Sequence, residues 1–311
     1  VETSRDAPPR FLASPRSLLE TVDLFRIDAS RKLDKRRRSE MGQFLTPASI
    51  ARLMASFLRP VPDSLRLLDA GAGVGSLCAA VVAEATTWPR PPAEIHVIAY
   101  EMEPSLAEYL VATLDECGTL CRNVGIRFVG DVRIQDFLSA GIEVIQGSQL
   151  FSGNALGVNT AILNPPYRKI STDSHTRRML RTVGIETTNL YTAFLWLAMK
   201  LLDDRGELVA ITPRSFCNGP YFLPFRRAMI GSMSIRRIHT FESRKHAFSD
   251  DDVLQENIIF HAAKKMDRTP VTISSSESPE DNDVAIRQVL HDELVIANDP
   301  NAFIRIATDE L

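Results

Sequence analysis

The segment Asn164-Pro165-Pro166-Tyr167 has the residue types of a site that holds a planar amine. Two consecutive prolines remove backbone donors and stiffen the turn. The side-chain oxygen of Asn164 and the carbonyl of Pro165 then become fixed acceptors, and Tyr167 adds a flat ring beside them. A structural Pro-Pro turn would need neither Asn nor Tyr. We therefore expect two acceptors for the two hydrogens of an NH₂ group, with a ring for stacking.

A second candidate site is the turn Gly71-Ala72-Gly73, which follows an apolar segment. Glycines let a ligand approach the backbone closely, but the third glycine of the dinucleotide pattern is missing. Asp69, just before the turn, would repel a pyrophosphate and favour a cationic or amine-bearing ligand. Glu101, at the end of the next expected strand, is placed to accept both hydroxyls of a ribose. Glu103 is the neighbouring alternative, and a purely structural turn is the alternative for the glycines.

The elements that must position these residues alternate between strand and helix patterns. Such alternation predicts an α/β fold with a doubly wound, mostly parallel sheet. Ligands of these sheets bind at the carboxyl ends of the strands, where each candidate site falls. Residues 274–283 are polar and contain proline, and we interpret them as a linker. The expected strands are 65–69, 94–100, 126–129, 160–163, 206–212, 235–241 and 257–262, and the expected helices are 47–58 with Thr46 as N-cap, 76–85, 104–116 and 190–202.

Composition indicates an ordinary globular protein of 311 residues, with 44% hydrophobic and 24% charged residues. This balance excludes disordered and coiled-coil chains. No apolar run reaches the roughly 18–20 residues that cross a bilayer, so no membrane partner is expected. The cysteines lack a disulfide or metal-ligand pattern, which predicts reduced thiols, a cytoplasmic protein and no metal site: Cys78, Cys117, Cys121 and Cys217.

Charge is unevenly spread, although 36 basic against 39 acidic residues give a net charge of only −3. One basic run lies between residues 31 and 38, a second follows Tyr167, and acids dominate from residue 277 onward. Two basic runs on a weakly acidic chain indicate a local phosphate-binding surface. The candidate phosphate contacts are Arg36, Arg37, Arg38, Arg168, Lys169, Arg177 and Arg178.

Several motifs in a fixed order resemble the gamma-class N6-adenine DNA methyltransferases of restriction–modification systems. The resemblance covers about residues 31–265 and implies a Rossmann-like class I methyltransferase fold. The tetrad 164–167 also occurs in enzymes that methylate RNA or protein glutamine, and the element at 42–47 favours DNA adenine. The motifs are Gly42-Gln43-Phe44-Leu45-Thr46-Pro47, Asp69-x-Gly71-x-Gly73, Glu101, Asp136-Phe137-Leu138, Asn164-Pro165-Pro166-Tyr167, the segment 214–222 and the segment 243–248.

The resemblance implies S-adenosylmethionine as methyl donor, residues 164–167 as the catalytic tetrad, and Tyr167 and Phe248 as stacking partners of the target base. Asp131 is the alternative to Asp136 as the carboxylate that accepts from the amino group of the donor's adenine. The stretch 139–159 is longer than the usual gap between motifs and is not explained by the resemblance. The implied donor-binding residues are Phe44, Thr46, Pro47, Asp69, Ala70, Gly71, Gly73, Glu101, Asp136 and Phe137.

The implied organisation has three parts: a helical and basic arm (1–40), a catalytic domain (41–275), and a linker with the start of a truncated target-recognition region (276–311). The implied activity is methyl transfer to N6 of a flipped-out adenine in a specific double-stranded DNA sequence, which protects that DNA in a restriction–modification system. Double-stranded DNA and a separate restriction endonuclease are the expected partners. The alternatives are a methyltransferase of RNA or protein glutamine and a non-catalytic nucleic-acid-binding subunit. The sequence specifies neither the recognition sequence nor the oligomeric state.

Overall fold

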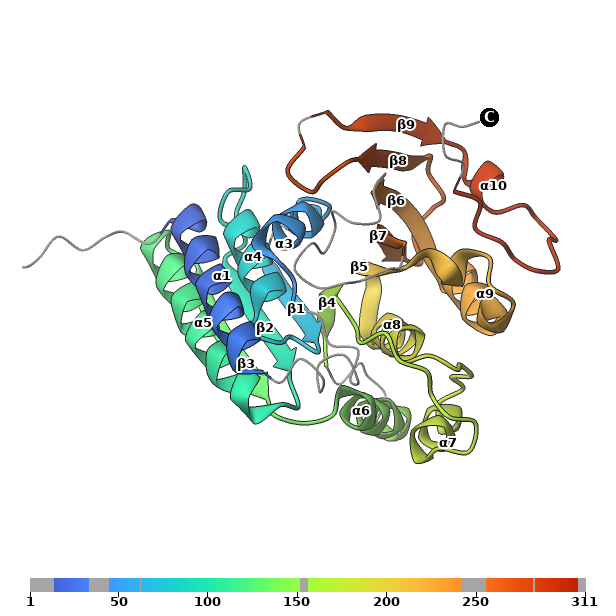
Figure 1. Cartoon of the computed structure of the whole chain (residues 1–311), viewed down its shortest axis with the longest axis horizontal. Coiled ribbons are helices and arrows are strands. Elements are labelled where there is room, and N and C mark those ends of the chain that lie inside the picture. Colours follow the sequence, from blue (N-terminus) through green and yellow to red (C-terminus); the bar gives the residue numbers. More distant parts are fainter. Residues whose placement is uncertain are drawn as a thin grey trace, which may run out of the picture.

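The computed structural model describes residues 14–33, 45–61, 63–151, 156–241, 256–281 and 283–306. Its strands form one nine-stranded sheet in the order β3-β2-β1-β4-β5-β7-β6-β8-β9 (Figure 1). The strands are β1 Ser64–Ala70, β2 Glu94–Tyr100, β3 Arg127–Arg133, β4 Val158–Leu163, β5 Leu202–Pro213, β6 Met233–Phe241, β7 Asn257–Lys264, β8 Val271–Ser276 and β9 Ala285–Val289.

The first five strands run parallel to one another. Strand β7 is antiparallel to both β5 and β6, β8 is parallel to β6, and β9 is antiparallel to β8. The strand order reverses between β1 and β4, which makes their carboxyl ends the topological switch point of the sheet. The prediction of a doubly wound, mostly parallel α/β sheet is confirmed.

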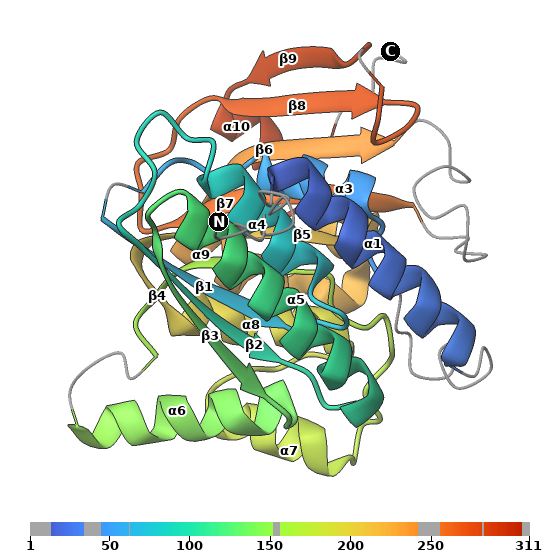
Figure 2. The ribbon, with the colours of Figure 1, turned by 90° about the vertical axis from the view of Figure 1, so that its left-hand side faces the viewer.

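Helices cover both faces of the sheet. Helices α1, α3, α4 and α5 pack together on one face, and α6, α8 and α9 on the other. Figure 2 looks onto the layer of α1, α4 and α5 and shows α8 and α9 behind the strands. The helices are α1 Pro15–Lys32, α3 Ala48–Ala55, α4 Ser76–Ala85, α5 Pro104–Asn123, α6 Phe137–Phe151, α7 His175–Thr182, α8 Leu190–Leu201, α9 Leu223–Ser232 and α10 His291–Leu294, with short 3₁₀ helices at Arg214–Cys217 and Pro220–Phe222.

The central strands are apolar on both faces because each face carries a helical layer. In β1, Leu65 and Leu67 belong to the core under α1, α3 and α4, whereas Leu68 and Ala70 belong to the core under α6 and α8. Helix α1 adds Leu18 to the first core, so part of the expected N-terminal arm packs on the sheet domain.

Most expected elements are confirmed to within about four residues of their expected bounds. Helix α5 continues to Asn123 instead of ending near residue 116. Helix α3 begins at Ala48 with Pro47 as N-cap, so the prediction of Thr46 as N-cap is wrong. The stretch 139–159, for which the resemblance had no explanation, supplies most of α6 and the start of β4.

The polar stretch 274–283 is not wholly a linker, because its first residues belong to β8. Ser274 and Ser276 hydrogen-bond the buried ring of His239 in β6 at 3.0 Å (Nδ1) and 3.2 Å (Nε2). Burial lowers the pKa of His239 to about 4, so the ring is neutral at pH 7. The expected domain boundary after residue 275 therefore falls inside a strand of the sheet.

The C-terminal part of the described chain packs against the segment that follows β5. The guanidinium of Arg226, 1% exposed, donates to the carbonyls of Phe216, Gly219 and Asn301. The Ile304 N–H donates to the carbonyl of Cys217 at 3.0 Å. Residues 301–304 are thereby joined to the segment that follows β5 by backbone and side-chain hydrogen bonds.

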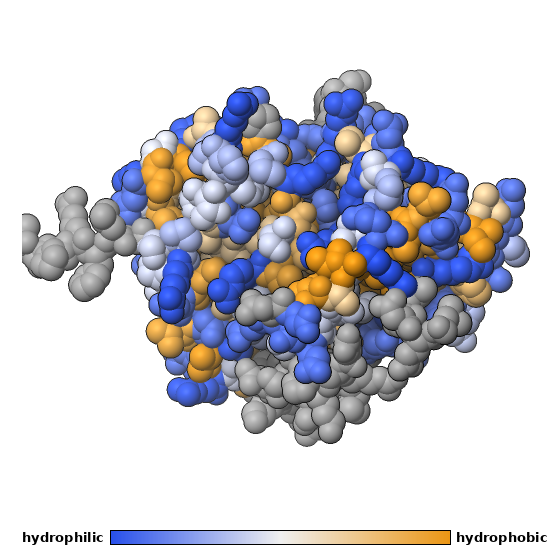
Figure 3. Space-filling model, turned by 90° about the horizontal axis from the view of Figure 1, so that it is seen from above, coloured by the Kyte–Doolittle hydropathy of each residue, from blue (hydrophilic) through white to orange (hydrophobic). Residues whose placement is uncertain are grey.

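The surface is mainly hydrophilic when viewed from above, with several separate hydrophobic patches (Figure 3). Exposed apolar side chains of the C-terminal part include Ile286, Leu290 and Ile296. Scattered exposed apolar residues are normal for a globular surface. Among the described residues, no helix combines the length and the apolar character that a membrane span requires.

We expect the free energy of unfolding to fall by about 1–3 kcal/mol between pH 7 and pH 4 through His239. Its folded pKa of about 4 lies below the value of about 6.5 of an unfolded histidine, so its contribution is complete above pH 6.5 and is lost toward pH 4. Urea unfolding followed by circular dichroism at several pH values measures this slope. His239→Gln should flatten it, whereas His175→Gln, at an exposed position of α7, should not. Equal slopes in both variants would contradict the assignment.

Candidate functional site

A cavity lies at the carboxyl ends of β1, β2 and β4, at the topological switch point. It encloses about 740 Å³ of empty space, part of it open to solvent. Its walls are Leu45, Thr46, residues 71–74, Ser76, Leu77, residues 100–102, Leu106, residues 135–137, Asn164, Pro166 and Phe194.

The glycine turn between β1 and α4 forms one wall and is fixed to the end of β2. The N–H groups of Gly71 and Ala72 both donate to the carbonyl of Tyr100, each at 2.9 Å. The Gly73 N–H donates to Oε2 of Glu101 at 2.9 Å. Gly71, Gly73 and Gly75 have φ of 76°, 59° and 86°, a region that strongly favours glycine. The backbone conformation that shapes this wall therefore requires these residues.

Glu101 presents a buried carboxylate to the cavity and is 3% exposed. Besides the bond from Gly73, its Oε1 accepts the N–H of Glu103 at 2.8 Å. Burial raises its pKa, and the backbone N–H donors oppose that rise. A carboxylate has about four acceptor positions, so these two bonds leave capacity for hydroxyl groups of a ligand.

Asp69 and Ala70 do not line the cavity, although the resemblance places both among the donor-binding residues. Both are 0% exposed, because the last residues of β1 are covered on both faces of the sheet. The Sγ of Cys78 donates to Oδ2 of Asp69 at 3.0 Å. Burial raises the pKa of Asp69 to about 7. The Asp69 carboxyl is thus buried against α4, and the cavity wall begins at Gly71.

Asp136, and not Asp131, lies at the cavity. Oδ2 of Asp136 accepts from the N–H of Ser139 at 3.0 Å and from its hydroxyl at 2.6 Å, which caps the start of α6. Asp131 forms an ion pair with Arg133 at 2.8 Å. The two candidates therefore have different environments, and one of them faces the ligand space.

Three aromatic rings form an apolar wall beside Asp136. The ring of Phe137 lies 5.3 Å from that of Tyr100 and 5.2 Å from that of Phe194, between ring centroids. Sequence reasoning singled out Phe137 but missed Tyr100 and Phe194. Tyr100 ends an apolar strand and Phe194 lies inside an apolar helix, so each resembles an ordinary core residue in the sequence.

Asn164 follows the last residue of β4 and lines the cavity. Its Nδ2 donates to the hydroxyl of Thr46 at 3.0 Å, and its Oδ1 lies 3.1 Å from the hydroxyl of Tyr167. The Tyr167 hydroxyl also lies 3.2 Å from the carbonyl of Ile211. The ring of Tyr191 packs edge-on against that of Tyr167, with centroids 6.1 Å apart. Burial raises the pKa of Tyr167, which keeps the phenol a donor at neutral pH.

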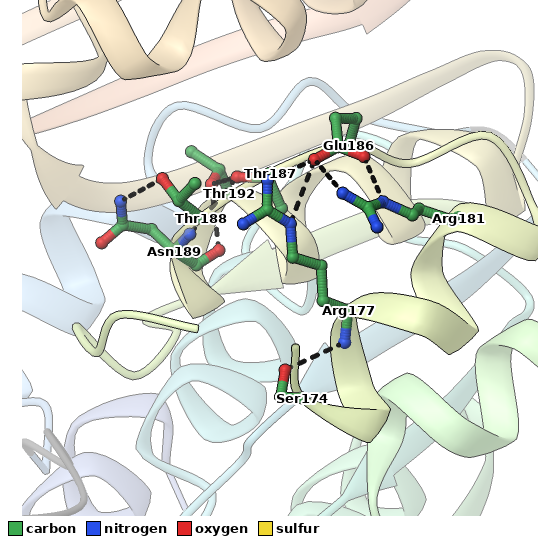
Figure 4. Close-up of polar contacts among 8 residues, drawn as sticks. All are labelled: Ser174, Arg177, Arg181, Glu186, Thr187, Thr188, Asn189 and Thr192. Carbon is green, nitrogen blue, oxygen red and sulfur yellow. Dashed lines mark hydrogen bonds and ion pairs between the residues drawn. The ribbon is translucent and has the colours of Figure 1, made fainter. Parts of the chain in front are cut away.

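The basic residues after Tyr167 divide into two groups. Arg177 and Arg181 both bind the carboxylate of Glu186, with Nε to oxygen distances of 3.0 and 2.6 Å (Figure 4). These arginines lower the pKa of Glu186 to about 2. Arg168, Lys169 and Arg178 are exposed instead. Their positions leave them better placed than Arg177 to meet a phosphate.

Five of the expected site residues lie outside the described residues: Arg36, Arg37, Arg38, Phe44 and Phe248. Pro47 is described and is the N-cap of α3. It does not line the cavity itself, but the residue before it, Thr46, does. Within the described ranges, no group of three or more His, Cys, Asp or Glu residues is arranged to hold a metal ion.

Comparison with known proteins gives one family match and two close relatives. Residues 121–248 match the Eco57I restriction-modification methylase family. The chain is 42% identical over 297 residues to the type II methyltransferase M.PstI of Providencia stuartii, covering 95% of this chain and 57% of that protein. It is 39% identical over 293 residues to the type II methyltransferase M.BsuBI of Bacillus subtilis, covering 94% and 57%. The chain thus spans little more than half the length of these relatives.

The fold also matches a solved structure with little sequence identity. This is a protein from Listeria monocytogenes described as a class I S-adenosylmethionine-dependent methyltransferase. The TM-score is 0.63 at 15% identity, and the match covers 88% of this chain and 76% of that one. This likeness supports the fold class alone.

The glycine turn generates a stability prediction. A Cβ at Gly75 would lie 2.9 Å from side-chain atoms of Leu110 and Thr113, at a φ of +86°. We expect Gly75→Ala to lower the free energy of unfolding by about 2–4 kcal/mol, through backbone strain and overpacking together. Gly125→Ala is the matched control, because its φ is +79° with no atom within 4 Å of the added Cβ. Gly125→Ala should lower the free energy of unfolding by about 1–2 kcal/mol, from backbone strain alone. Equal losses in urea unfolding would contradict the steric part of this account.

Proposed function

This chain carries an Eco57I restriction-modification methylase domain, and from that premise we propose that it transfers a methyl group from S-adenosylmethionine to N6 of an adenine in DNA. The resemblance to restriction–modification methyltransferases is thereby confirmed at the level of the family. One observation carries the finer proposal: the side chain of Asn164 lines the same cavity as the glycine turn and Glu101. An acceptor for an amine and a site for a small-molecule donor therefore share one space.

The residues at the cavity fit S-adenosylmethionine, which supplies an electrophilic methyl group on a cationic sulfur when bound. Glu101 has the acceptor capacity for two ribose hydroxyls. Asp136 and the rings of Phe137 and Phe194 offer an acceptor and an apolar wall for an adenine. The glycine turn lets the donor lie against bare backbone. Asp69, whose carboxyl accepts from Cys78 of α4, makes no contact with the donor in this proposal.

Asn164 and Pro165 act on the target amine. An adenine N6 is a poor nucleophile because its lone pair is delocalised into the ring. When Oδ1 of Asn164 and the carbonyl of Pro165 both accept from the NH₂ group, the nitrogen moves toward tetrahedral geometry and its lone pair becomes available. Catalysis by these residues then consists of positioning and electrostatics.

Tyr167 stacks on the target base in this proposal. The base must leave the duplex to reach the cavity, at a cost of a few kcal/mol. Tyr191 holds the ring of Tyr167 edge-on and so fixes its orientation. Stacking on a fixed aromatic ring contributes about 1–3 kcal/mol per base to the free energy of binding. Phe248, outside the described residues, remains the predicted second contact.

Double-stranded DNA is the proposed partner, and the exposed Arg168, Lys169 and Arg178 are its phosphate contacts on the described chain. Such contacts determine affinity and salt dependence and carry no sequence information. The basic residues 36–38 remain predicted contacts. A separate restriction endonuclease remains an expected partner of the whole protein. We also propose that the whole protein acts on a specific DNA sequence; the chain spans 57% of the length of M.PstI and of M.BsuBI.

We expect the full-length enzyme to transfer tritium from methyl-labelled S-adenosylmethionine to unmethylated, PCR-amplified bacterial genomic DNA, with N6-methyladenine as the labelled nucleoside. Asn164→Ala should lower turnover by about 100-fold or more while donor affinity stays within a few-fold, because the lost acceptor acts mainly in the transition state. Label in RNA, protein or N4-methylcytosine would refute adenine as the target. Near-parental methylation of adenine by Asn164→Ala would refute the assigned role of Asn164.

Glu101 gives a test of the donor site that needs no DNA. Glu101→Ala should weaken donor binding, measured by calorimetry, by roughly 1–3 kcal/mol, the cost of losing a buried hydrogen-bonding partner. Glu103→Ala, two residues along on the same segment, is the control and should leave affinity within about 3-fold of the parent. Glu103 does not line the cavity. Equal losses for both variants would contradict the assignment of Glu101 to the donor.

A further inference from the structure

Thr46 joins two segments that lie 118 positions apart in the sequence. Its hydroxyl accepts a hydrogen bond of 3.0 Å from Nδ2 of Asn164. Thr46 is 6% exposed, and both residues line the cavity. Because Pro47 occupies the N-cap of α3 without a side-chain cap, the Thr46 hydroxyl is not used to cap that helix. The Thr46 hydroxyl instead accepts a hydrogen bond from the side-chain amide of Asn164, the residue that follows β4.

The orientation of the Asn164 amide matters because its two ends have opposite chemistry. Only Oδ1 can accept from an amine, whereas Nδ2 is a donor. The terminal torsion of asparagine is broad and roughly two-fold, so the side chain alone does not favour one orientation strongly. In the structure, Thr46 holds the nitrogen end, and the oxygen end lies near the Tyr167 hydroxyl. Contacts at both Nδ2 and Oδ1 therefore fix the orientation of the Asn164 amide.

The segment that carries Thr46 is itself fixed from two sides. The N–H of Ala48, at the start of α3, donates to Oδ1 of Asp23 in α1 at 3.2 Å. The side chain of Leu45 packs so closely on the glycine turn that a Cβ on Gly73 would lie 2.9 Å from its Cδ2. The Thr46 hydroxyl is therefore held by the packing of α1, α3 and the turn, and its position does not depend on Asn164 alone.

We infer that Thr46 is a positioning residue, which orients the Asn164 amide so that Oδ1 is presented to the target amine. This inference rests on the proposed function and adds a residue to it. Thr46 itself touches neither reacting atom in this account. It acts through Asn164, and its effect should appear in the rate of methyl transfer more than in the binding of either substrate.

The test compares Thr46→Val, which keeps the shape but removes the hydroxyl, with Thr46→Ser, which keeps the hydroxyl. For the full-length enzyme on the genomic DNA described above, Thr46→Val should lower kcat by about 10- to 100-fold, with KM for DNA within about 3-fold of the parent. Thr46→Ser should stay within about 3-fold of the parent in both constants. Donor affinity, measured by calorimetry, should change little in either variant.

A second measurement follows the amide itself without turnover. In protein labelled with ¹⁵N-asparagine, the side-chain signal that disappears in Asn164→Ala belongs to Asn164. Thr46→Val should shift that signal and speed its exchange with solvent, and Thr46→Ser should leave both close to the parent. This readout reports the Thr46–Asn164 contact whether or not the chain methylates adenine.

The two proposals fail in different ways. If the parent enzyme does not methylate adenine, the proposed function fails, although the spectroscopic comparison still tests the contact. If the parent is active and Thr46→Val behaves like Thr46→Ser, the inference about Thr46 is overturned. A loss of donor affinity that accounts for the whole effect of Thr46→Val would also overturn it, because Thr46 would then act through the donor and not through Asn164.

Discussion

Three consecutive backbone N–H groups, those of Gly71, Ala72 and Gly73, donate to the end of β2, and the geometry of the site depends on these bonds. They join the turn after β1 to the carbonyl of Tyr100 and the carboxylate of Glu101. A turn held so firmly at positive φ can serve as a cavity wall without side chains of its own. It also gives the buried carboxylate of Glu101 a second backbone donor, beside the N–H of Glu103, and these donors offset its desolvation.

Local patterns in the sequence were sufficient to predict the parts of the fold that depend on short-range chemistry. Strands β1 and β2 are apolar runs that end at a turn signal, so their bounds were predicted closely. The end of α5 was not, because the residues after 116 include Gly118 and look like a helix terminus, whereas packing against β3 extends the helix to Asn123. Of the site, the residues at strand ends were predictable because parallel strands bring those ends together.

Long-range partners account for what the sequence did not reveal. Ser274 and Ser276 look like linker residues until the ring of His239, 35 and 37 positions away, supplies their hydrogen bonds. Phe194 was missed because an apolar helix gives no sign that one of its rings faces a cavity. Asp69 was expected at the ligand because it adjoins the turn, yet coverage of β1 on both faces directs it inward. Thr46 was predicted both to cap a helix and to bind the donor; it does not cap α3, its hydroxyl binds Asn164, and its place at the donor stays a prediction.

The buried guanidinium of Arg226 bears on where this polypeptide can be cut. Its three carbonyl partners come from Phe216, Gly219 and Asn301, so the segment after β5 and the C-terminal stretch share one charged group. A shortened version ending after β8 would keep the bonds to Phe216 and Gly219 but would remove the carbonyl of Asn301 from Nε and Nη2 of Arg226, and donors of a buried charge that lack partners are costly. For expression, crystallisation or domain fusion, a polypeptide that keeps these contacts must therefore extend at least through residue 306, because Arg214 also donates to the carbonyl of Ile306.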